Sequence, residues 1–322
     1  MKSLSLHMFG ALACIIAMAV LSTTVGVADM SFQSVLTGQG EDTLILLVSR
    51  IPRTLAIVLT GVAMAIAGLI FQMLTRNKFV EPSTAGTAES AGLGLLVAVL
   101  LFPLAPLMVK MLIASGFAIA GTFLFLRILD RLPVHQPLLV PLVGLMLGGV
   151  IGALATFFAY QFDLLQYLGI WTTGEFSGVL RGRYESLWIT GILAVIGYIF
   201  ADRFSIMGMG RDVSVTLGLN YRSVMWLGLF IVAVITALVI VTVGNIPFLG
   251  LIVPNIVSRF VGDNLRLAVP WAASLGAGLL LFCDILGRVV RAPYEIPIGT
   301  IFGILGSAVF LFLLLRRKRY AA

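Results

Sequence analysis

One segment of the sequence, residues 54–75, contains no charged residue and is bounded by basic residues on both sides. Arg50 and Arg53 precede this segment, and Arg76 and Lys78 follow it. A stretch of about 20 apolar residues is long enough to cross the hydrocarbon core of a bilayer. Several similar segments follow along the chain, so the sequence predicts a protein that lies in a membrane.

The composition of the whole chain agrees with a membrane protein. Hydrophobic residues make up 60% of the sequence and charged residues 11%, whereas a soluble domain carries roughly 25% charged residues. No long polar stretch is available for a separate aqueous domain, so we expect residues 1–322 to form a single transmembrane domain. The net charge of +7 is spread over short basic clusters between apolar runs. Such clusters are typical of a membrane surface, which favours membrane lipid and argues against nucleic acid as a partner.

Hydropathy predicts an all-α polytopic membrane protein with about ten transmembrane helices. The expected spans are 8–28, 52–74, 84–102, 107–126, 137–159, 187–202, 223–243, 247–261, 268–290 and 297–315. The first could instead belong to a signal peptide, but its full spanning length favours a retained helix. Glycines interrupt residues 164–180, so we expect a short helix at the outer surface there.

The distribution of lysine and arginine predicts which loops face the cytoplasm. If both termini lie inside, fourteen of the 21 basic residues fall on the inner side and five on the outer side, and Lys110 and Arg288 lie within spans. The excess agrees with the positive-inside rule, but this rule does not explain the outer residues. The five outer residues are Arg50, Arg53, Arg181, Arg183 and Arg291.

Two stretches, 77–94 and 244–254, interrupt the helical pattern at membrane depth with glycine and proline. Irregular backbone within a membrane needs protein or water as a hydrogen-bonding partner. These stretches therefore indicate either a translocation path or simple structural kinks. Small residues at four-residue spacing, such as Gly144, Gly148 and Gly152, allow close helix packing or line a pathway, and the spacing alone does not decide between them.

No group of side chains in the sequence indicates enzyme chemistry. Cys14 and Cys283 fall inside apolar runs, where packing explains them better than a disulfide or a metal. His7 and His135 are isolated, so we expect no metal site, no catalytic residue and no cofactor bound by this chain. The sequence also lacks the Gly-x-x-x-x-Gly-Lys-Ser/Thr phosphate loop.

The chain resembles the permease subunits of binding-protein-dependent ABC importers for iron–siderophore complexes, haem and cobalamin. The matching pieces, in order, are 50–53, 76–77, 81–82, 218–219, 244–254, Asp284 with Arg288, and 295–299. Three further strings, 79–88, 161–184 and 291–294, resemble the siderophore branch. One departure is Asn255, where many relatives carry histidine.

The resemblance implies a type II ABC importer permease architecture with ten helices in each of two permease subunits. It further implies two cytoplasmic ATPase subunits, which use ATP and Mg, and a periplasmic or lipoprotein siderophore-binding protein. The expected function is ATP-driven alternating access for an iron–siderophore complex in the bacterial inner membrane. Because siderophore systems often use two different permeases, we expect a heterodimer.

Two alternative functions remain open. The first is a haem or cobalamin importer permease of the same family. The second is an ion-coupled secondary transporter, which would need carboxylates buried in the membrane, and Glu89 and Asp284 are the candidates for that role.

The resemblance also implies roles for three outer arginines. Arg50, Arg53 and Arg288 match positions at which the family pairs with glutamates of the binding protein, and fixed cations would orient such an acidic partner. The alternative is anchoring at the interface, with Arg288 neutralising Asp284 on the same helix face. Arg288 lies near the outer end of its span, so we expect it to reach water by snorkelling.

The longest inner loop, about residues 205–222, resembles the family's coupling helices, which contact the ATPase. The residues implied in this contact are Arg211, Asp212, Gly218, Leu219 and Asn220. The alternative is a solvated basic loop held by lipid headgroups.

The candidates for a substrate path are Glu89, Glu175, Phe176, Arg291, Tyr294 and Glu295. Ferric siderophores are often anionic, so Arg291 could attract them, and Tyr294 and Phe176 could contact an aromatic chelate. Equally, Arg291 and Glu295 could neutralise each other, and Glu89 could simply be a carboxylate at a helix N-terminus.

Overall fold

The computed structural model describes residues 2–25, 41–131 and 139–317. These residues form helices and the loops that connect them, which confirms the expected all-α fold. In chain order the elements are α1 (Lys2–Thr24), α3 (Glu41–Ile45), the π-helix η1 (Leu46–Arg50), α4 (Ile51–Thr75), the 3₁₀ turn η2 (Pro82–Ala85), α5 (Thr87–Leu101), α6 (Leu107–Leu129), α7 (Leu139–Gln161), α8 (Leu165–Thr172), α9 (Leu187–Ile199), α10 (Ala201–Gly208), α11 (Arg211–Thr216), α12 (Tyr221–Val243), α13 (Leu249–Val261), α14 (Leu265–Val289) and α15 (Ile298–Arg317).

Among the described residues, 6 helical stretches are long and apolar enough to cross a membrane. They are α1, the continuous stretch Asp42–Thr75, α6, α7, α12 and α14. α9 and α10 would form a seventh span together, but they are bent by 64°. α5, α13 and α15 are shorter apolar helices, and the 13 residues of α13 rise only about 20 Å, against a hydrocarbon core of roughly 30 Å. The count of about ten transmembrane helices therefore stays a prediction.

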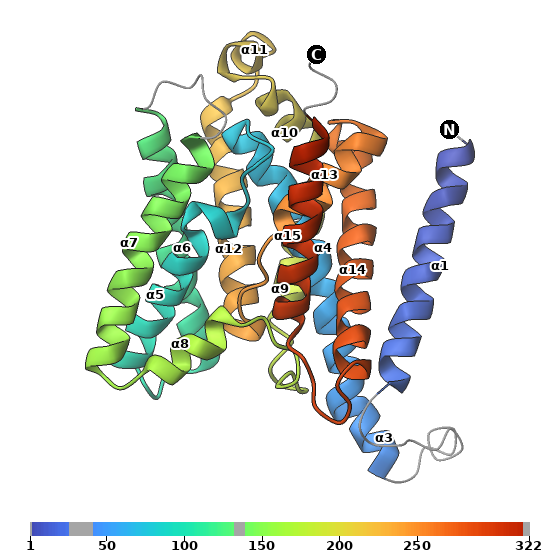
Figure 1. Ribbon diagram of the computed structural model, residues 1–322. Coiled ribbons are helices and arrows are strands. Elements are labelled where there is room, and N and C mark those ends of the chain that lie inside the picture. Colours follow the sequence, from blue (N-terminus) through green and yellow to red (C-terminus); the bar gives the residue numbers. More distant parts are fainter. Residues whose placement is uncertain (1, 26–40, 132–138, 318–322) are drawn as a thin grey trace.

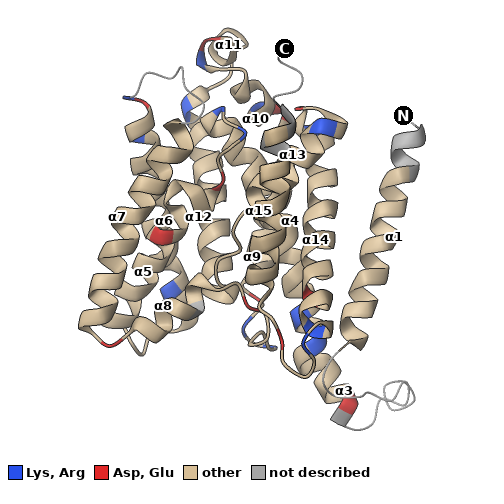
Figure 2. Cartoon of the chain, in the orientation of Figure 1, with Lys and Arg blue, Asp and Glu red and all other residues tan. Residues whose placement is uncertain are grey.

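The helices form a bundle with two opposite ends (Figure 1). We call the end that carries α10 and α11 the α11 face, and the end that carries α3 the α3 face. The first turn of α1 and the last turn of α15 both lie on the α11 face. Lysine and arginine gather at the two faces and are sparse between them (Figure 2). This distribution follows from the apolar sequences of the helices that connect the two faces.

α4 runs through the middle of the bundle, and its two glycines allow neighbouring backbones to approach. A Cβ on Gly61 would lie 2.6 Å from the carbonyl oxygen of Gly276 in α14, and a Cβ on Gly68 would lie 2.1 Å from that of Gly250 in α13. Both separations are too short for any side chain larger than hydrogen. The charge-free residues 54–75 therefore form a central helix, against which α9, α12, α13 and α14 pack.

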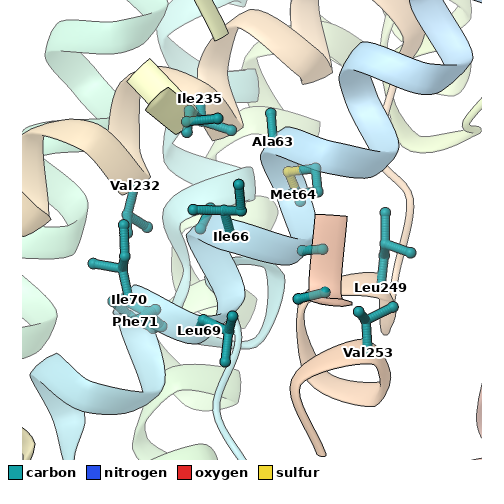
Figure 3. Packing of buried hydrophobic residues seen from close by; sticks show 14 of the residues in the cluster. Ala63, Met64, Ile66, Leu69, Ile70, Phe71, Val232, Ile235, Leu249 and Val253 are labelled. Atoms are coloured by element: carbon teal, nitrogen blue, oxygen red, sulfur yellow. The ribbon is translucent and has the colours of Figure 1, made fainter. Parts of the chain in front are cut away.

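The side chains of α4 fill the space between two partner helices. Ile66, Leu69 and Ile70 are among the α4 residues that lie near Val232 of α12 and Val253 of α13 (Figure 3). All of these side chains are buried. In a bilayer this core is held by close packing rather than by the hydrophobic effect alone, because lipid tails are as apolar as these side chains.

Candidate functional site

A buried ion network lies on the α3 face, with Asp284 of α14 at its centre. One carboxylate oxygen, Oδ1, accepts hydrogen bonds from Arg53 Nε at 3.0 Å and Nη2 at 2.7 Å. The other, Oδ2, accepts from Arg288 and from Ser22 Oγ, the latter at 3.0 Å. Arg53 Nη1 also donates to Glu295 Oε2 at 2.7 Å. The network, which we call the α3-face cluster, thus joins α1, α4, α14 and the segment before α15.

Two arginines of this face hold the end of α1. Arg288 Nη1 donates to the carbonyl oxygens of Ser22 at 2.9 Å and Val25 at 2.6 Å, and Arg50 Nη1 donates to those of Thr23 at 2.9 Å and Thr24 at 3.0 Å. The last carbonyls of a helix have no partner within the helix, and a cation there also complements the helix dipole. Arg50 and Arg288 therefore tie α1 to α4 and α14.

This arrangement corrects the expectation that Arg288 reaches water. Its exposed fraction is only 7%, the same as for Arg50, because the end of α1 covers both guanidinium groups. The expected neutralisation of Asp284 by Arg288 is confirmed. Helical spacing did not reveal the second partner, Arg53, whose side chain is 12% exposed and lies on another helix.

The three residues predicted to dock a binding protein thus lie together at one face. The structure also shows that Arg291 and Glu295 do not pair with each other. Glu295 pairs with Arg53 at 2.7 Å rather than with Arg291. The guanidinium carbon of Arg291 instead lies 5.8 Å from the ring centroid of Tyr294, so this pair remains at the surface.

A second polar feature, the Glu89 cavity, lies between α5, α7, α8 and α12. It has a volume of about 250 Å³, and Glu89, Trp171, Thr172 and Asn245 are among its lining residues. Glu89 Oε2 is buried and has no hydrogen-bond partner among the residues that the structure describes. An unpaired oxygen facing a cavity at membrane depth is a candidate for contact with a ligand or an ion.

The glycines of α7 make room for this carboxylate and also allow close packing. A Cβ on Gly148 would lie 3.2 Å from Glu89 Oε2, whereas a Cβ on Gly144 would lie 2.1 Å from the carbonyl oxygen of Thr84. Gly144 therefore allows close packing, whereas Gly148 lines the space around Glu89.

Backbone hydrogen bonds bring the walls of the Glu89 cavity together. The amide of Asn245 donates to the carbonyl oxygen of Trp171 at 2.9 Å, and the amide of Glu175 donates to that of Val243 at 2.8 Å. The amide of Gly299 then donates to Gly174 at 2.8 Å. The interrupted segment after α12 is thereby paired with the end of α8 and the start of α15. Sequence reasoning did not select Asn245 as a site residue, although its position inside an interrupted stretch was a signal.

The other interrupted stretch meets the start of α13 through Glu81. Its side chain has 0% exposure, and Oε1 accepts from the Phe248 amide at 2.7 Å and from Ser83 Oγ at 2.5 Å. Phe248, at φ +67°, precedes the first turn of α13 in a left-handed conformation. Glu81 thus caps a helix that is distant in sequence, which explains how irregular backbone survives at this depth.

The remaining substrate-path candidates lie apart from the Glu89 cavity. Glu175 is exposed and accepts from Ser177 Oγ at 2.5 Å. Tyr294 is 70% exposed, whereas Phe176 is 1% exposed and packs in the core. Phe176 therefore offers no surface to a ligand in this conformation.

The loop predicted to couple to an ATPase contains two short helices, as its glycines indicated. α10 continues from α9 after the 64° bend, and α11 lies between turns at Gly210 (φ +114°) and Gly218 (φ +79°). Positive φ values of this kind favour glycine.

α11 presents apolar side chains at the end of the bundle. Val213, Val215 and Leu217 are 44%, 57% and 62% exposed, while Ser214 is buried and its Oγ donates to the Gly210 carbonyl at 2.6 Å. Arg211 and Asp212 are exposed as well. An exposed group of apolar residues outside the membrane helices is typical of a protein-contact surface.

Comparisons with known proteins agree with this geometry. The sequence profile described as the FecCD transport family matches residues 11–316. The chain belongs to this family. It is 50% identical to the petrobactin import system permease protein YclN of Bacillus subtilis (strain 168), over 95% of this chain and 97% of that protein.

Two further relatives are permease proteins of siderophore transport systems. The chain is 40% identical to the petrobactin import system permease protein FatD of Bacillus anthracis, over 96% of this chain and 91% of that protein. It is 40% identical to the ferric-anguibactin transport system permease protein FatD of Vibrio anguillarum (strain ATCC 68554 / 775), over 84% and 86% of the two chains.

A solved structure shows the same fold. It is an inward-facing conformation of a metal-chelate type ABC transporter, which superimposes with a TM-score of 0.81 at 22% identity and covers 96% of this chain and 98% of that chain. The chain is therefore a multi-pass membrane permease of the ABC importer class. It is a transport subunit rather than an enzyme, and the ATPase of such a system is a separate subunit.

Proposed function

We propose that this chain carries an iron–siderophore complex across the bacterial inner membrane by ATP-driven alternating access. The observation that carries this proposal is the near full-length match, at 50% identity, to a petrobactin import permease. Two other relatives are named as permease proteins of a petrobactin import system and of a ferric-anguibactin transport system. The siderophore branch is therefore favoured over haem and cobalamin, and ferric petrobactin is the first substrate to test.

The proposed assembly contains a second, different permease subunit, ABC ATPase subunits and a periplasmic or lipoprotein siderophore-binding protein. ATP and Mg bind to the ATPase, and this chain holds no cofactor of its own. The α11 face is cytoplasmic in this proposal, together with both termini. The basic ends of α4, α6 and α12 on that face support this orientation through the positive-inside rule.

The two faces then have different tasks. The binding protein contacts the α3 face near Arg50, Arg53 and Arg288, of which Arg53 is the most exposed, with 12% of its side chain accessible. The ATPase contacts α11 and the following turn, where Arg211, Asp212, Gly218, Leu219 and Asn220 lie. The exposed apolar side chains of α11 support this contact, because a contact that transmits motion needs a packed surface.

Substrate would pass on the side of the bundle that carries the Glu89 cavity and the start of α15. Glu89 lines the cavity from α5, whereas Glu175 follows α8, and the other three candidates lie in the segment between α14 and α15, where Glu295 joins the α3-face cluster. Arg291 and Tyr294 are exposed and adjacent, so they would meet an anionic aromatic chelate first.

Uptake of radiolabelled ferric petrobactin in a strain that lacks the gene tests the proposed substrate. We expect uptake to return with the wild-type gene and to fail with Leu219→Asp, which places a charge in the coupling contact. Ser223→Asp, one turn along the start of α12, is a matched control that should transport. Restored uptake of haem or cobalamin, but not of any ferric siderophore, would show that the substrate class is wrong.

The docking proposal needs a separate experiment, because Arg50 and Arg288 also hold α1. Arg53→Glu should abolish binding of the solute receptor, while Arg53→Lys keeps the charge and should retain part of it. Membrane abundance and co-purification of the ATPase are measured for both variants. Undiminished receptor binding by Arg53→Glu would contradict the proposal.

A further inference from the structure

A second cavity, on the α11 face, has a composition that transport itself does not explain. Its volume is about 610 Å³, and it lies where α4 and α6 end and where α7 and α12 begin. Four arginines line it, one each from the ends of α4, α6 and α12 and one from α11. They are Arg76, Arg127, Arg222 and Arg211.

These four arginines have no counter-ion among the described residues. None of their guanidinium groups forms a salt bridge or a hydrogen bond with any part of the chain that the structure places. Asp130 is the one acidic residue among those that line the cavity. The adjoining segment, 132–138, contains no Asp or Glu in its sequence, so it cannot supply a carboxylate.

Other basic residues of the same face show that this lack of pairing is local. Arg266 pairs with Asp202 at 2.6 Å, and Lys78 pairs with Asp263 at 2.8 Å. Asp202 lies at the start of α10, and Asp263 and Arg266 lie at the turn between α13 and α14, on the α11 face. The cavity therefore combines four arginines with a single carboxylate among the described residues that line it, Asp130, which forms a salt bridge with none of them.

One wall of the cavity is apolar and faces outward. The rings of Phe123 and Trp226 stack there with centroids 5.3 Å apart and planes 16° apart. They remain 41% and 44% exposed, although they belong to the membrane helices α6 and α12. Exposed tryptophan at the end of a membrane helix is typical of the lipid interface. A ligand in this cavity would thus meet cations at one end and aromatic rings along its side.

We propose that this cavity binds the headgroup of an anionic phospholipid, with an acyl chain lying along Phe123 and Trp226. Guanidinium groups bind phosphate oxygens in a bidentate manner. Basic pockets between membrane helices are typical sites for anionic lipid headgroups. The stacked rings favour a lipid over free phosphate, which would make no use of an apolar wall, and over an acidic protein surface, which would not extend along the membrane helices.

A bound lipid would connect the membrane helices with α11. Arg211 is the first residue of α11, and it lines the same cavity as Arg76 at the end of α4 and Tyr221, the first residue of α12. A phosphate among these arginines would relieve their mutual repulsion and fix the position of α11 relative to α4 and α12. This role is independent of which substrate the protein transports.

Quenching of tryptophan fluorescence by brominated lipid tests the proposal on the full-length chain in detergent, purified with its companion subunits. We expect brominated phosphatidylglycerol to quench saturably and brominated phosphatidylcholine to quench only weakly. Trp226→Phe, which preserves the ring stack, should remove the saturable part of the signal and thereby assign it to this cavity.

The double variant Arg127→Gln/Arg222→Gln is expected to weaken phosphatidylglycerol binding on the order of tenfold or more, because each basic residue near an anionic lipid contributes measurably. Arg203→Gln, on α10 outside the cavity, is the matched control and should bind as the wild type does. Unchanged binding by the double variant, or equal quenching by the two lipids, would overturn the proposal. Complete displacement of phosphatidylglycerol by inorganic phosphate would also overturn the proposal. So would a double variant that binds phosphatidylglycerol normally but no longer co-purifies with the ATPase subunit.

Discussion

The arginines at the two ends of the bundle differ in what surrounds them. On the α3 face, Arg53 and Arg288 share the buried carboxylate of Asp284, and Arg50 and Arg288 bind the last carbonyls of α1. On the α11 face, the cavity arginines, such as Arg127 and Arg222, point into an open cavity and have no carboxylate partner in the described part of the chain. Arginines at one end are thus held by partners within the chain, whereas the cavity arginines at the other have none among the described residues.

This difference shows why charge alone does not identify a binding residue. A buried charge must be paired and hydrogen-bonded, because the cost of removing it from water is large. An exposed charge carries little such cost and can remain unpaired until a ligand arrives. Partners and burial, which only the three-dimensional arrangement provides, therefore separate the two kinds of arginine. The four predictions that follow test this separation, from the largest expected effect to the smallest.

Removal of Asp284 should cause the largest loss of stability. Asp284→Ala leaves Arg53 and the buried guanidinium group of Arg288 without their shared anion, and breaking a buried pair costs about 3–5 kcal/mol. The midpoint of thermal unfolding of the purified protein measures the loss. Asp202→Ala, which breaks the exposed pair with Arg266, is the matched control and should lower the midpoint little.

Removal of Arg288 should detach the end of α1. Arg288→Gln deletes the charged hydrogen bonds to Ser22 and Val25, each of which contributes about 1.5–3 kcal/mol when its acceptor stays buried. Hydrogen exchange at the last turn of α1, followed by mass spectrometry, should become faster while that of α4 is preserved. Equal protection of α1 in both proteins would show that packing alone holds this helix.

The double variant Arg127→Gln/Arg222→Gln should separate ligand binding from stability. Because neither arginine has a described partner, the unfolding free energy of the lipid-free protein should change by less than about 0.5 kcal/mol. In phosphatidylglycerol, the wild type should gain thermal stability through ligand binding, and the double variant should gain less. A large loss of stability without lipid would show that these arginines stabilise the fold rather than bind a ligand.

The smallest effect is expected at the exposed pair of Lys78 and Asp263. Partial burial of Asp263 tends to raise its pKa, but hydrogen bonds from Lys78 and Ser258 and the charge of Lys78 outweigh this and hold the pKa below its usual value. A carboxylate with a lowered pKa stabilises the folded state above its unfolded pKa, about 3.9, and this contribution is lost as the pH falls through the lower folded value.

Lys78→Gln tests this effect. It should reduce stability at pH 7 by about 1 kcal/mol or less and should flatten the pH dependence of the melting midpoint below about pH 4. Arg259→Gln, near the end of α13, is the control and should leave the pH dependence of the melting midpoint below about pH 4 unchanged. If Lys78→Gln also leaves this pH dependence unchanged, Lys78 does not lower the pKa of Asp263.

The sequence predicted the regular parts of the fold well. Each expected span overlaps a helix, since a run of apolar residues can satisfy its backbone in a membrane only within a helix or a closed barrel. The interruptions were predicted only in part. The chain is outside α-helix between α4 and α5 and between α12 and α13, but α5 already begins at Thr87 and includes Gly92 and Gly94. α13 begins at Leu249 and includes Pro254. The bend between α9 and α10 was not predicted, since residues 187–202 contain no proline.

The candidate sites were predicted only in part. The pairing of Asp284 with Arg288 followed from their spacing on one helix. Glu295 was assigned to Arg291 as one alternative, yet it pairs with Arg53, which lies 242 residues away in the sequence. Phe176 was selected for its aromatic ring, and its burial in the core could not be known from a loop sequence.

The sequence by itself determined that this protein lies in a membrane, is helical and resembles an importer permease, because hydropathy, charge position and short motifs are local properties. Only the tertiary structure decided which arginines lie in ion pairs and which line a cavity, that Glu81 caps α13, and that Glu89 lines a cavity. These outcomes depend on contacts between helices that are far apart in the chain. A one-dimensional pattern carries no record of such contacts, since the partner of each charge is chosen by packing.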